Sequence, residues 1–216
     1  MAPKLTVVGL GGSLSGHSSS LAALQIALNG ADEVGARTEL LDIRQLALPM
    51  YDSEISTPPD SVIKLCKAVS GADGLIWSSP LYHGTISGLF KNALDWLELL
   101  ADHDPPYLTD KVVGLITTAG GVQGLQGVNT MEFVVRALRG WTVPFVMPIA
   151  QAWKAFDEHG KPVDIRLAEQ LIALGREVAR AASQFALEPP TKADAAKAEA
   201  EVTPSSDREA RSGKIN

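Results

Sequence analysis

The chain alternates short apolar runs with amphipathic helical patterns from residue 4 to residue 185, and this alternation restricts its fold more than any other feature. Five runs have the length and residue types of buried strands: 4–10, 37–43, 75–78, 111–118 and 142–149. A helical pattern follows each of them. Strands that alternate with helices in this way predict a parallel sheet covered by helices on both faces.

The order of these strands follows from connection rules. Right-handed crossovers leave few arrangements for five parallel strands, and a sheet of this length favours the order 2-1-3-4-5. Ligands of such sheets bind at the carboxyl ends of the strands, where the strand order reverses between strands 1 and 3. We therefore expect a site on the loops after strands 1, 3 and 4, which are the segments 11–20, 79–87 and 118–127.

Length and charge restrict the class of protein. The 216 residues suffice for one well-buried α/β domain, which we place at 1–187. The segment 188–216 has almost no large apolar residue, so we expect a disordered polar tail. A net charge of −6 disfavours nucleic acid as a partner. The chain shows neither a signal peptide nor an apolar run near the roughly 20 residues of a membrane span, so we expect a cytoplasmic protein that does not bind membranes.

Metal and thiol chemistry find little support in the sequence. The histidines His17, His83, His103 and His159 lack metal-ligand spacing, so we expect no metal site. The single cysteine, Cys66, excludes an intramolecular disulfide and falls on the apolar face of a helix. A buried, inert thiol is the simplest interpretation.

The first loop is rich in groups that can donate hydrogen bonds to a phosphate. The following helix adds free N–H groups and the positive end of its dipole. The segment lacks the motif of a P-loop, the third glycine of a dinucleotide fingerprint, and the serine of a nucleophile elbow, where Leu14 stands instead. The alternative is a polar turn with a serine N-cap. The candidate phosphate ligands are the hydroxyls of Ser13, Ser15, Ser18, Ser19 and Ser20.

The other two loops suit a flat, amphipathic ring such as that of a flavin. In the second loop, Tyr82 and Ile86 can wall a ring, and Gly84 permits close approach of the backbone. Taken alone, Tyr82 fits a packing residue as well as it fits a ring contact. His83 alone fits a surface or hydrogen-bonding histidine better than a catalytic base. At the start of the third loop, residues 117–121 are small enough for a flat ring to approach the backbone. The remaining candidate ring contacts are Pro80, Leu81, Thr85, Thr118, Ala119, Gly120 and Gly121.

Three segments of the chain resemble the NADPH-dependent FMN reductase family, and the likeness spans about residues 4–185. Residues 12–18 (GSLSGHS) are similar to the family's phosphate loop, Gly-Ser-x-Arg-x-x-Ser. Residues 80–96 (PLYHGTISGLFKNALDW) resemble Pro-Glu-Tyr-Asn-x-x-Ile-x-Gly-x-Leu-Lys-Asn-Ala-Ile-Asp-Trp, which is the most specific of the three matches. Residues 118–121 resemble the Ser/Thr-x-Gly-Gly turn beside the flavin ring.

The resemblance implies a flavodoxin-like three-layer sandwich that binds FMN with the candidate residues of all three loops. It implies hydride transfer from NADPH or NADH to flavin N5, and then to free flavin, a quinone or a similar small acceptor. No side chain need be catalytic, because the cofactor carries the chemistry. A flavin-dependent monooxygenase is one partner that could receive reduced flavin. Relatives form homodimers or homotetramers, and the apolar segment 96–100 would suit a subunit contact.

The chain departs from the family pattern at three positions. Ser15 replaces an arginine near the phosphates, which bears on FMN affinity and on the choice between NADPH and NADH. Leu81 replaces a glutamate and His83 an asparagine beside the ring, which bears on the second substrate. Two other functions stay open: a flavodoxin-like electron carrier without its own nicotinamide substrate, and a Rossmann-type reductase without flavin.

Overall fold

The central strands are buried along almost their whole length, as expected of a sheet covered on both faces. In the computed structural model, which describes residues 5–186, β1 (Thr6–Gly11), β3 (Gly74–Tyr82) and β5 (Val112–Thr118) form the middle of the sheet. β2 (Arg37–Asp42) pairs with β1 at one edge, and its first four residues are partly or fully exposed. The charged residues Arg37 and Glu39 of this strand thus lie at the edge of the sheet, where solvent can reach them.

The sheet has seven strands instead of the predicted five, because two segments differ from expectation. The fifth predicted strand is split into β6 (Trp141–Thr142) and β7 (Met147–Ile149), which pair in parallel with the start and the end of β5. Pro144, which lacks a backbone donor, lies between them. The second difference is β4 (Thr85–Ile86), which pairs antiparallel with the end of β3. With β6 and β7 taken together as the fifth strand, the order is the predicted 2-1-3-4-5.

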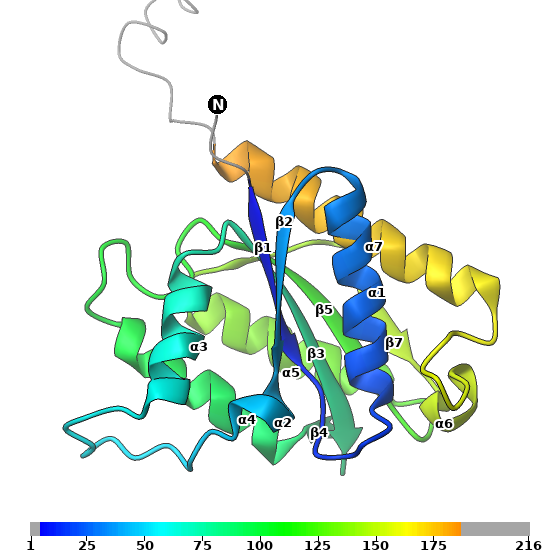
Figure 1. Ribbon diagram of the computed structural model, residues 1–216, viewed down its shortest axis with the longest axis horizontal. Helices are drawn as coiled ribbons and strands as arrows, with labels where there is room; N and C mark the ends of the chain where they lie inside the picture. Colours follow the sequence, from blue (N-terminus) through cyan, green and yellow to red (C-terminus); the bar gives the residue numbers. More distant parts are fainter. Residues whose placement is uncertain (1–4, 187–216) are drawn as a thin grey trace, which may run out of the picture. The chain divides into compact units, whose positions relative to one another are not determined.

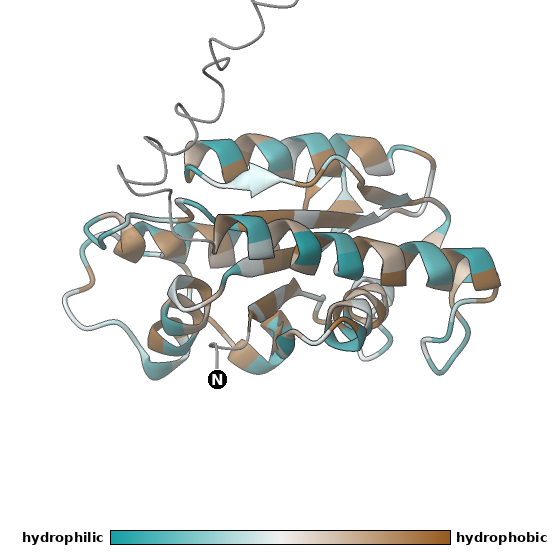
Figure 2. Cartoon of the chain, turned by 90° about the horizontal axis from the view of Figure 1, so that it is seen from above, coloured by the Kyte–Doolittle hydropathy of each residue, from teal (hydrophilic) through white to brown (hydrophobic). Residues whose placement is uncertain are grey.

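Helices form a layer on each face of the sheet (Figure 1). α1 (Ser19–Glu33) and α7 (Ile165–Phe185) pack on one face. The other face is covered by α3 (Asp60–Ser70), α4 (Gly88–Asp95), the 3₁₀ helix η1 (Trp96–Leu100) and α5 (Gly124–Ala137). Figure 2 shows mostly apolar strands between helices that carry both apolar and polar residues. The chain is thus a flavodoxin-like three-layer sandwich.

Two helical segments differ from regular long helices. The connection after β2 begins with the short helix α2 (Ile43–Leu46), which Asp42 caps by accepting a hydrogen bond from the Arg44 N–H. The helix that starts as α4 tightens into η1 at Trp96, and three of the five η1 residues are buried in this chain's own core. Only Leu99 of the apolar residues in 96–100 is exposed, so this segment offers little for a subunit contact.

The interface of α1 and α7 depends on two glycines. A Cβ atom on Gly175 would lie 1.7 Å from the Ala27 carbonyl oxygen, and one on Gly30 would lie 2.2 Å from the Ile172 carbonyl oxygen. The two helix backbones therefore touch directly, which no other residue type would allow.

Residues 1–4 and 187–216 lie outside the described residues, and the predicted polar tail falls within the second of these segments. Within residues 5–186, no helix is long and apolar enough to cross a membrane.

Candidate functional site

The three predicted loops meet at the carboxyl edge of the sheet because their strands are neighbours in register. Gly11 of β1 lies opposite Ser78 of β3, and Pro80 of β3 lies opposite Thr118 of β5. The Gly12 N–H donates to the Ser78 carbonyl oxygen at 3.2 Å and draws the first loop towards the second. We call residues 12–18 the first loop, 80–86 the second loop and 118–123 the third loop.

Two glycines allow the first loop to pack closely against its neighbours where it leaves β1. A Cβ on Gly11 would lie 2.3 Å from the Ser78 carbonyl oxygen. Gly12 has a φ of +108°, and a Cβ there would lie 3.1 Å from Asp42 Oδ1. Both positions therefore exclude a side chain, so the backbone itself forms the floor of the loop.

The five serine hydroxyls of the predicted phosphate site have different surroundings. Those of Ser13 and Ser15 lie in the exposed part of the loop, where each accepts a local backbone N–H at 3.3 Å. Ser18 caps α1 by accepting from the Leu21 N–H at 3.2 Å. Ser20 is buried, and Ser19 donates to the Ala152 carbonyl oxygen at 3.3 Å. Ser20 is therefore the least accessible of the five hydroxyls, and Ser15 the most exposed.

A positive charge that sequence reasoning missed lies beside this loop. Arg44, from α2, places Nη1 3.6 Å from the position that a Cβ on Gly16 would occupy. Arg44 is exposed, and none of the ion pairs among residues 5–186 involves it. Its position could have been anticipated, because β2 pairs with β1 and Arg44 follows the end of β2 directly. The first turn of α1 carries no acidic residue that would oppose an anion.

The second loop is a hairpin instead of the predicted open loop. His83 has a φ of +50° and Gly84 a φ of +85°, which are the left-handed conformations of a tight two-residue turn between β3 and β4. Tyr82 is 55% exposed at this tip, with His83, Gly84 and Thr85 exposed beside it. Ile86 is only 5% exposed and packs in the core, so only its backbone can border a ligand. Pro80 is buried in β3, and Leu81 is half-buried.

The third loop exposes its two glycines to solvent, whereas hydrogen bonds of Ala119 hold its other residues in place. Thr118 and Ala119 are buried, whereas Gly120 and Gly121 are exposed, and a Cβ on Gly120 would meet nothing within 4 Å. The Ala119 N–H donates to the Ile149 carbonyl oxygen at 2.8 Å, and the Ala152 N–H donates to the Ala119 carbonyl oxygen at 2.9 Å. The exposed glycines leave the backbone of this loop accessible, and Val122 beside them is also exposed (79%).

The polar residues of α4 brace the structure behind the second loop, as expected. The Asn92 side chain accepts from the Tyr51 N–H and donates to the Pro49 carbonyl oxygen, both at 2.8 Å. The Trp96 indole N–H donates to the same oxygen at 2.9 Å. Lys91 and Asp95 form an ion pair one helical turn apart.

The other candidates remain outside the site. Burial raises the pKa of the Cys66 thiol to about 11, and the thiol donates to the Trp96 carbonyl oxygen, which fits an inert core residue. Within residues 5–186, no group of three or more histidine, cysteine, aspartate or glutamate side chains could hold a metal ion.

Comparison with known proteins identifies relatives of the chain. The family profile described as NADPH-dependent FMN reductase matches residues 5–154. The NADPH-dependent FMN reductase ArsH of Acidithiobacillus ferrooxidans is 32% identical over 127 residues, which are 59% of this chain and 52% of that protein. The chain therefore spans about half the length of this relative.

Two further likenesses cover more of the compared protein. The FMN-dependent NADPH-azoreductase of Staphylococcus aureus is 32% identical over 136 residues, which are 61% of this chain and 68% of that protein. The crystal structure of FerB, a flavoenzyme NAD(P)H:(acceptor) oxidoreductase from Paracoccus denitrificans, superimposes with a TM-score of 0.64 at 24% identity. It covers 84% of this chain and 98% of FerB, and at this identity it shows the shared fold.

Proposed function

The chain belongs to the NADPH-dependent FMN reductase family, and we propose that it binds FMN on its three loops and reduces a small acceptor at the expense of NADPH or NADH. The observation that carries the proposal is the convergence of the first, second and third loops at one edge of the sheet. The names of the ArsH and azoreductase relatives support FMN as cofactor and NADPH as reductant. When bound, the flavin supplies the atom that accepts and returns the hydride.

The first loop fits the phosphate end of FMN. A dianion gains from several hydroxyl donors, from the free N–H groups of a long helix and from a nearby cation. The loop provides the hydroxyls of Ser13, Ser15 and Ser18, the amino end of α1, and Arg44 from α2. Arg44 thereby supplies the charge that the family motif provides where this chain has Ser15.

The second and third loops fit the flat end of FMN. Tyr82 provides an aromatic face at the hairpin tip, and the glycines of the third loop let a ring approach the backbone. The open side of the third loop leaves room for a nicotinamide or an acceptor above the ring. These residues bind and orient, and the proposal assigns none of them a proton-transfer step.

The proposal extends to properties that follow from family membership. Free flavin, a quinone or a similar small molecule serves as acceptor, and a flavin-dependent monooxygenase is a partner that can take up reduced flavin. The protein acts in the cytoplasm as a homodimer or homotetramer. Because 96–100 is largely buried within the chain, the subunit contact is formed elsewhere on the surface.

An absorbance experiment tests the proposed function. The purified protein is mixed with FMN, freed of unbound flavin and treated anaerobically with NADPH or NADH. We expect a bound flavin chromophore that bleaches rapidly and returns when a quinone is added. Slow bleaching by both nucleotides would favour the electron carrier, and a protein that retains no flavin would exclude both flavin functions. Gly12→Val, which blocks the floor of the first loop, should prevent FMN retention.

A further inference from the structure

A groove lies between α4 and α5, the two helices that follow the second and third loops. We call it the helix groove. Its volume is about 460 Å³, and Leu94, Val134 and Leu138 give it an apolar lining. Tyr51 also lines it and is held edge-on against the Trp96 ring, with the ring centroids 5.2 Å apart. The helix groove is therefore formed by side chains that the core of the chain fixes in place.

An aromatic ring projects from α5 beside the helix groove. Phe133 is 67% exposed, although the next residue, Val134, lines the groove, as does Ala137 one turn further along. The same helix exposes Leu125, and Val122 is exposed directly before it. Large apolar side chains that gather in this way on one helix mark an interaction surface, and aromatic residues are enriched in such surfaces.

The projecting ring and the helix groove lie next to each other, so this face of the chain can serve as its own partner. In a contact with two-fold symmetry, both chains use the same patch, and each feature of one meets its complement on the other. Phe133 of each copy can then enter the helix groove of the other. A small molecule in the groove would leave Phe133 exposed to water, whereas a second copy covers both.

The charges along the helix groove favour the same occupant. Lys91 and Glu98 both line the groove and lie two helical turns apart along α4 and η1. Lys91 pairs with Asp95, whereas Glu98 is exposed and takes part in none of the ion pairs among residues 5–186. A two-fold axis that reverses the direction of the groove brings Lys91 of each copy close to Glu98 of the other.

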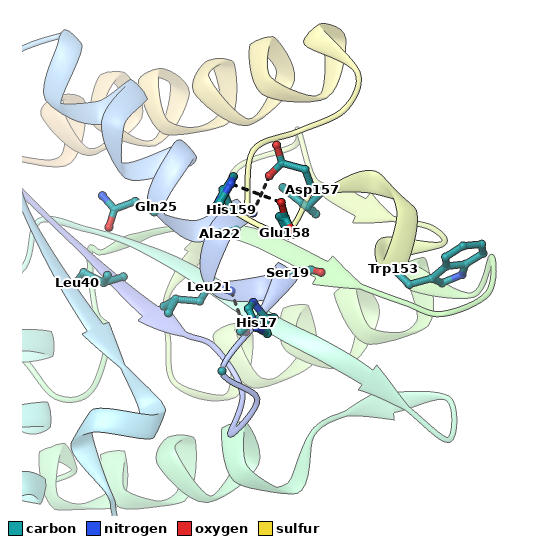
Figure 3. A pocket seen from close by; sticks show the side chains of 14 residues that line it. His17, Ser19, Leu21, Ala22, Gln25, Leu40, Trp153, Asp157, Glu158 and His159 are labelled. Carbon is teal, nitrogen blue, oxygen red and sulfur yellow. Dashed lines mark hydrogen bonds and ion pairs between the residues drawn. The ribbon is translucent and has the colours of Figure 1, made fainter.

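A second exposed aromatic residue lies on the other side of the sheet and provides a matched control. Trp153 belongs to the short helix α6 (Ala152–Ala155), is 73% exposed and has its ring turned outward (Figure 3). Ala152 and Ala155 of this helix pack with the core between the sheet, α1 and α7. Trp153 is therefore as exposed as Phe133 but remote from the helix groove.

We propose that the helix groove is the contact between two copies of this chain, each of which inserts Phe133 into the groove of the other. The proposal rests on the proposed function, because it names the contact of the homo-oligomer proposed there. α4 begins two residues after the second loop, and α5 begins directly after the third loop. The contact thus joins the helices that follow two of the three loops of the proposed cofactor site.

Sedimentation velocity of the full chain over a range of concentrations measures the dissociation constant of the dimer. Phe133→Ser should raise this constant about thirtyfold, as expected for an aromatic residue at the centre of an interface. In a tetramer, the same variant should release dimers. Trp153→Ser should change the constant by less than about twofold. Urea unfolding of both variants checks that each remains folded.

An exchange of charges tests the two-fold arrangement separately. Glu98→Lys should raise the dissociation constant about fivefold, because it places two cations close together across the contact. Lys91→Glu added to this variant should restore most of the lost affinity, since the pair is then reversed. Glu169→Lys is the matched control, because Glu169 is exposed on α7, on the other side of the sheet.

A dimer that Phe133→Ser and Trp153→Ser weaken alike would overturn the proposed contact, as would a charge exchange that restores nothing. A chain that stays monomeric at every concentration would overturn both this contact and the proposed homo-oligomer. Failure of FMN to bind would instead refute the flavin function and leave the sedimentation results unchanged, so the failures are distinguishable.

Discussion

We propose that Arg44 replaces the arginine that the family motif carries at the position of Ser15. The first loop has Ser15 where the family motif has arginine, and Arg44 reaches the same loop from the end of the neighbouring strand. Charged contacts of exposed side chains contribute on the order of 1 kcal/mol or less. In the proposed site, Arg44 would thus add to donors that are mainly hydroxyls and backbone N–H groups.

We predict that Arg44→Ala lowers the affinity for FMN about fivefold and leaves the affinity for riboflavin, which lacks the phosphate, almost unchanged. Fluorescence titration of both flavins measures the difference. Arg139→Ala is the control, because Arg139 lies over the Tyr107 ring away from the three loops. Ser15→Arg in the Arg44→Ala background should restore FMN affinity, and an equal loss for both flavins would contradict the assignment.

The buried thiol of Cys66 should make the stability of the fold depend on pH. Its pKa of about 11 in the folded protein exceeds that of an unfolded thiol, so above the unfolded value the unfolded chain loses this proton first. The contribution of the Cys66 thiol to the free energy of unfolding is therefore complete below about pH 8.5 and is lost as the pH rises towards 11. Urea midpoints should fall less steeply over this range for Cys66→Ala than for the unchanged protein. Parallel slopes would show that the thiol does not contribute.

At the scale of elements, the contact of α1 with α7 is the least tolerant interface. Gly175→Ala would place a methyl group 1.7 Å from the Ala27 carbonyl oxygen, so the two helices must separate. We expect a loss of about 1–3 kcal/mol in the free energy of unfolding, the usual cost of overpacking. Ala173→Ser, at an exposed position of the same helix, should change it by less than about 0.5 kcal/mol. Denaturant unfolding compares the two, and equal stabilities would contradict the contact.

The elements also show which parts of the fold the sequence could predict. The order of the long strands follows from alternation and handedness, which are properties of every βαβ unit. The hairpin at the second loop was missed because it depends on left-handed conformations at His83 and Gly84 and on pairing of only two residues. Arg44 was missed because it lies beside the first loop only when the folded sheet brings the end of β2 next to β1.

At the scale of the whole molecule, the three loops come from segments that are spread over more than a hundred residues of the chain. A ligand that contacts all of them binds the folded chain and has no matching site in the unfolded chain. FMN at about 100 times its dissociation constant should therefore stabilise the fold by about 2.7 kcal/mol, and raise the melting temperature by roughly 5–10 °C. Riboflavin at the same concentration should raise it less.

Thermal melts at increasing FMN concentration measure this effect. Gly12→Val provides the control, because its blocked first loop should remove the dependence on FMN. A melting temperature that does not respond to FMN in the unchanged protein would contradict a flavin site shared by the three loops.

The backbone N–H and carbonyl groups of Ala152 have a consequence for where the chain can be cut. Its carbonyl oxygen accepts from Ser19, and its N–H donates to Ala119, so this one unit joins the start of α1 to the third loop. New termini opened by circular permutation between 150 and 153 would cut this joint and uncouple the first and third loops, the two ends of the proposed cofactor site. The turn at 102–106 joins η1 to the far end of β5, so it is the better place to reopen the chain or insert a reporter domain.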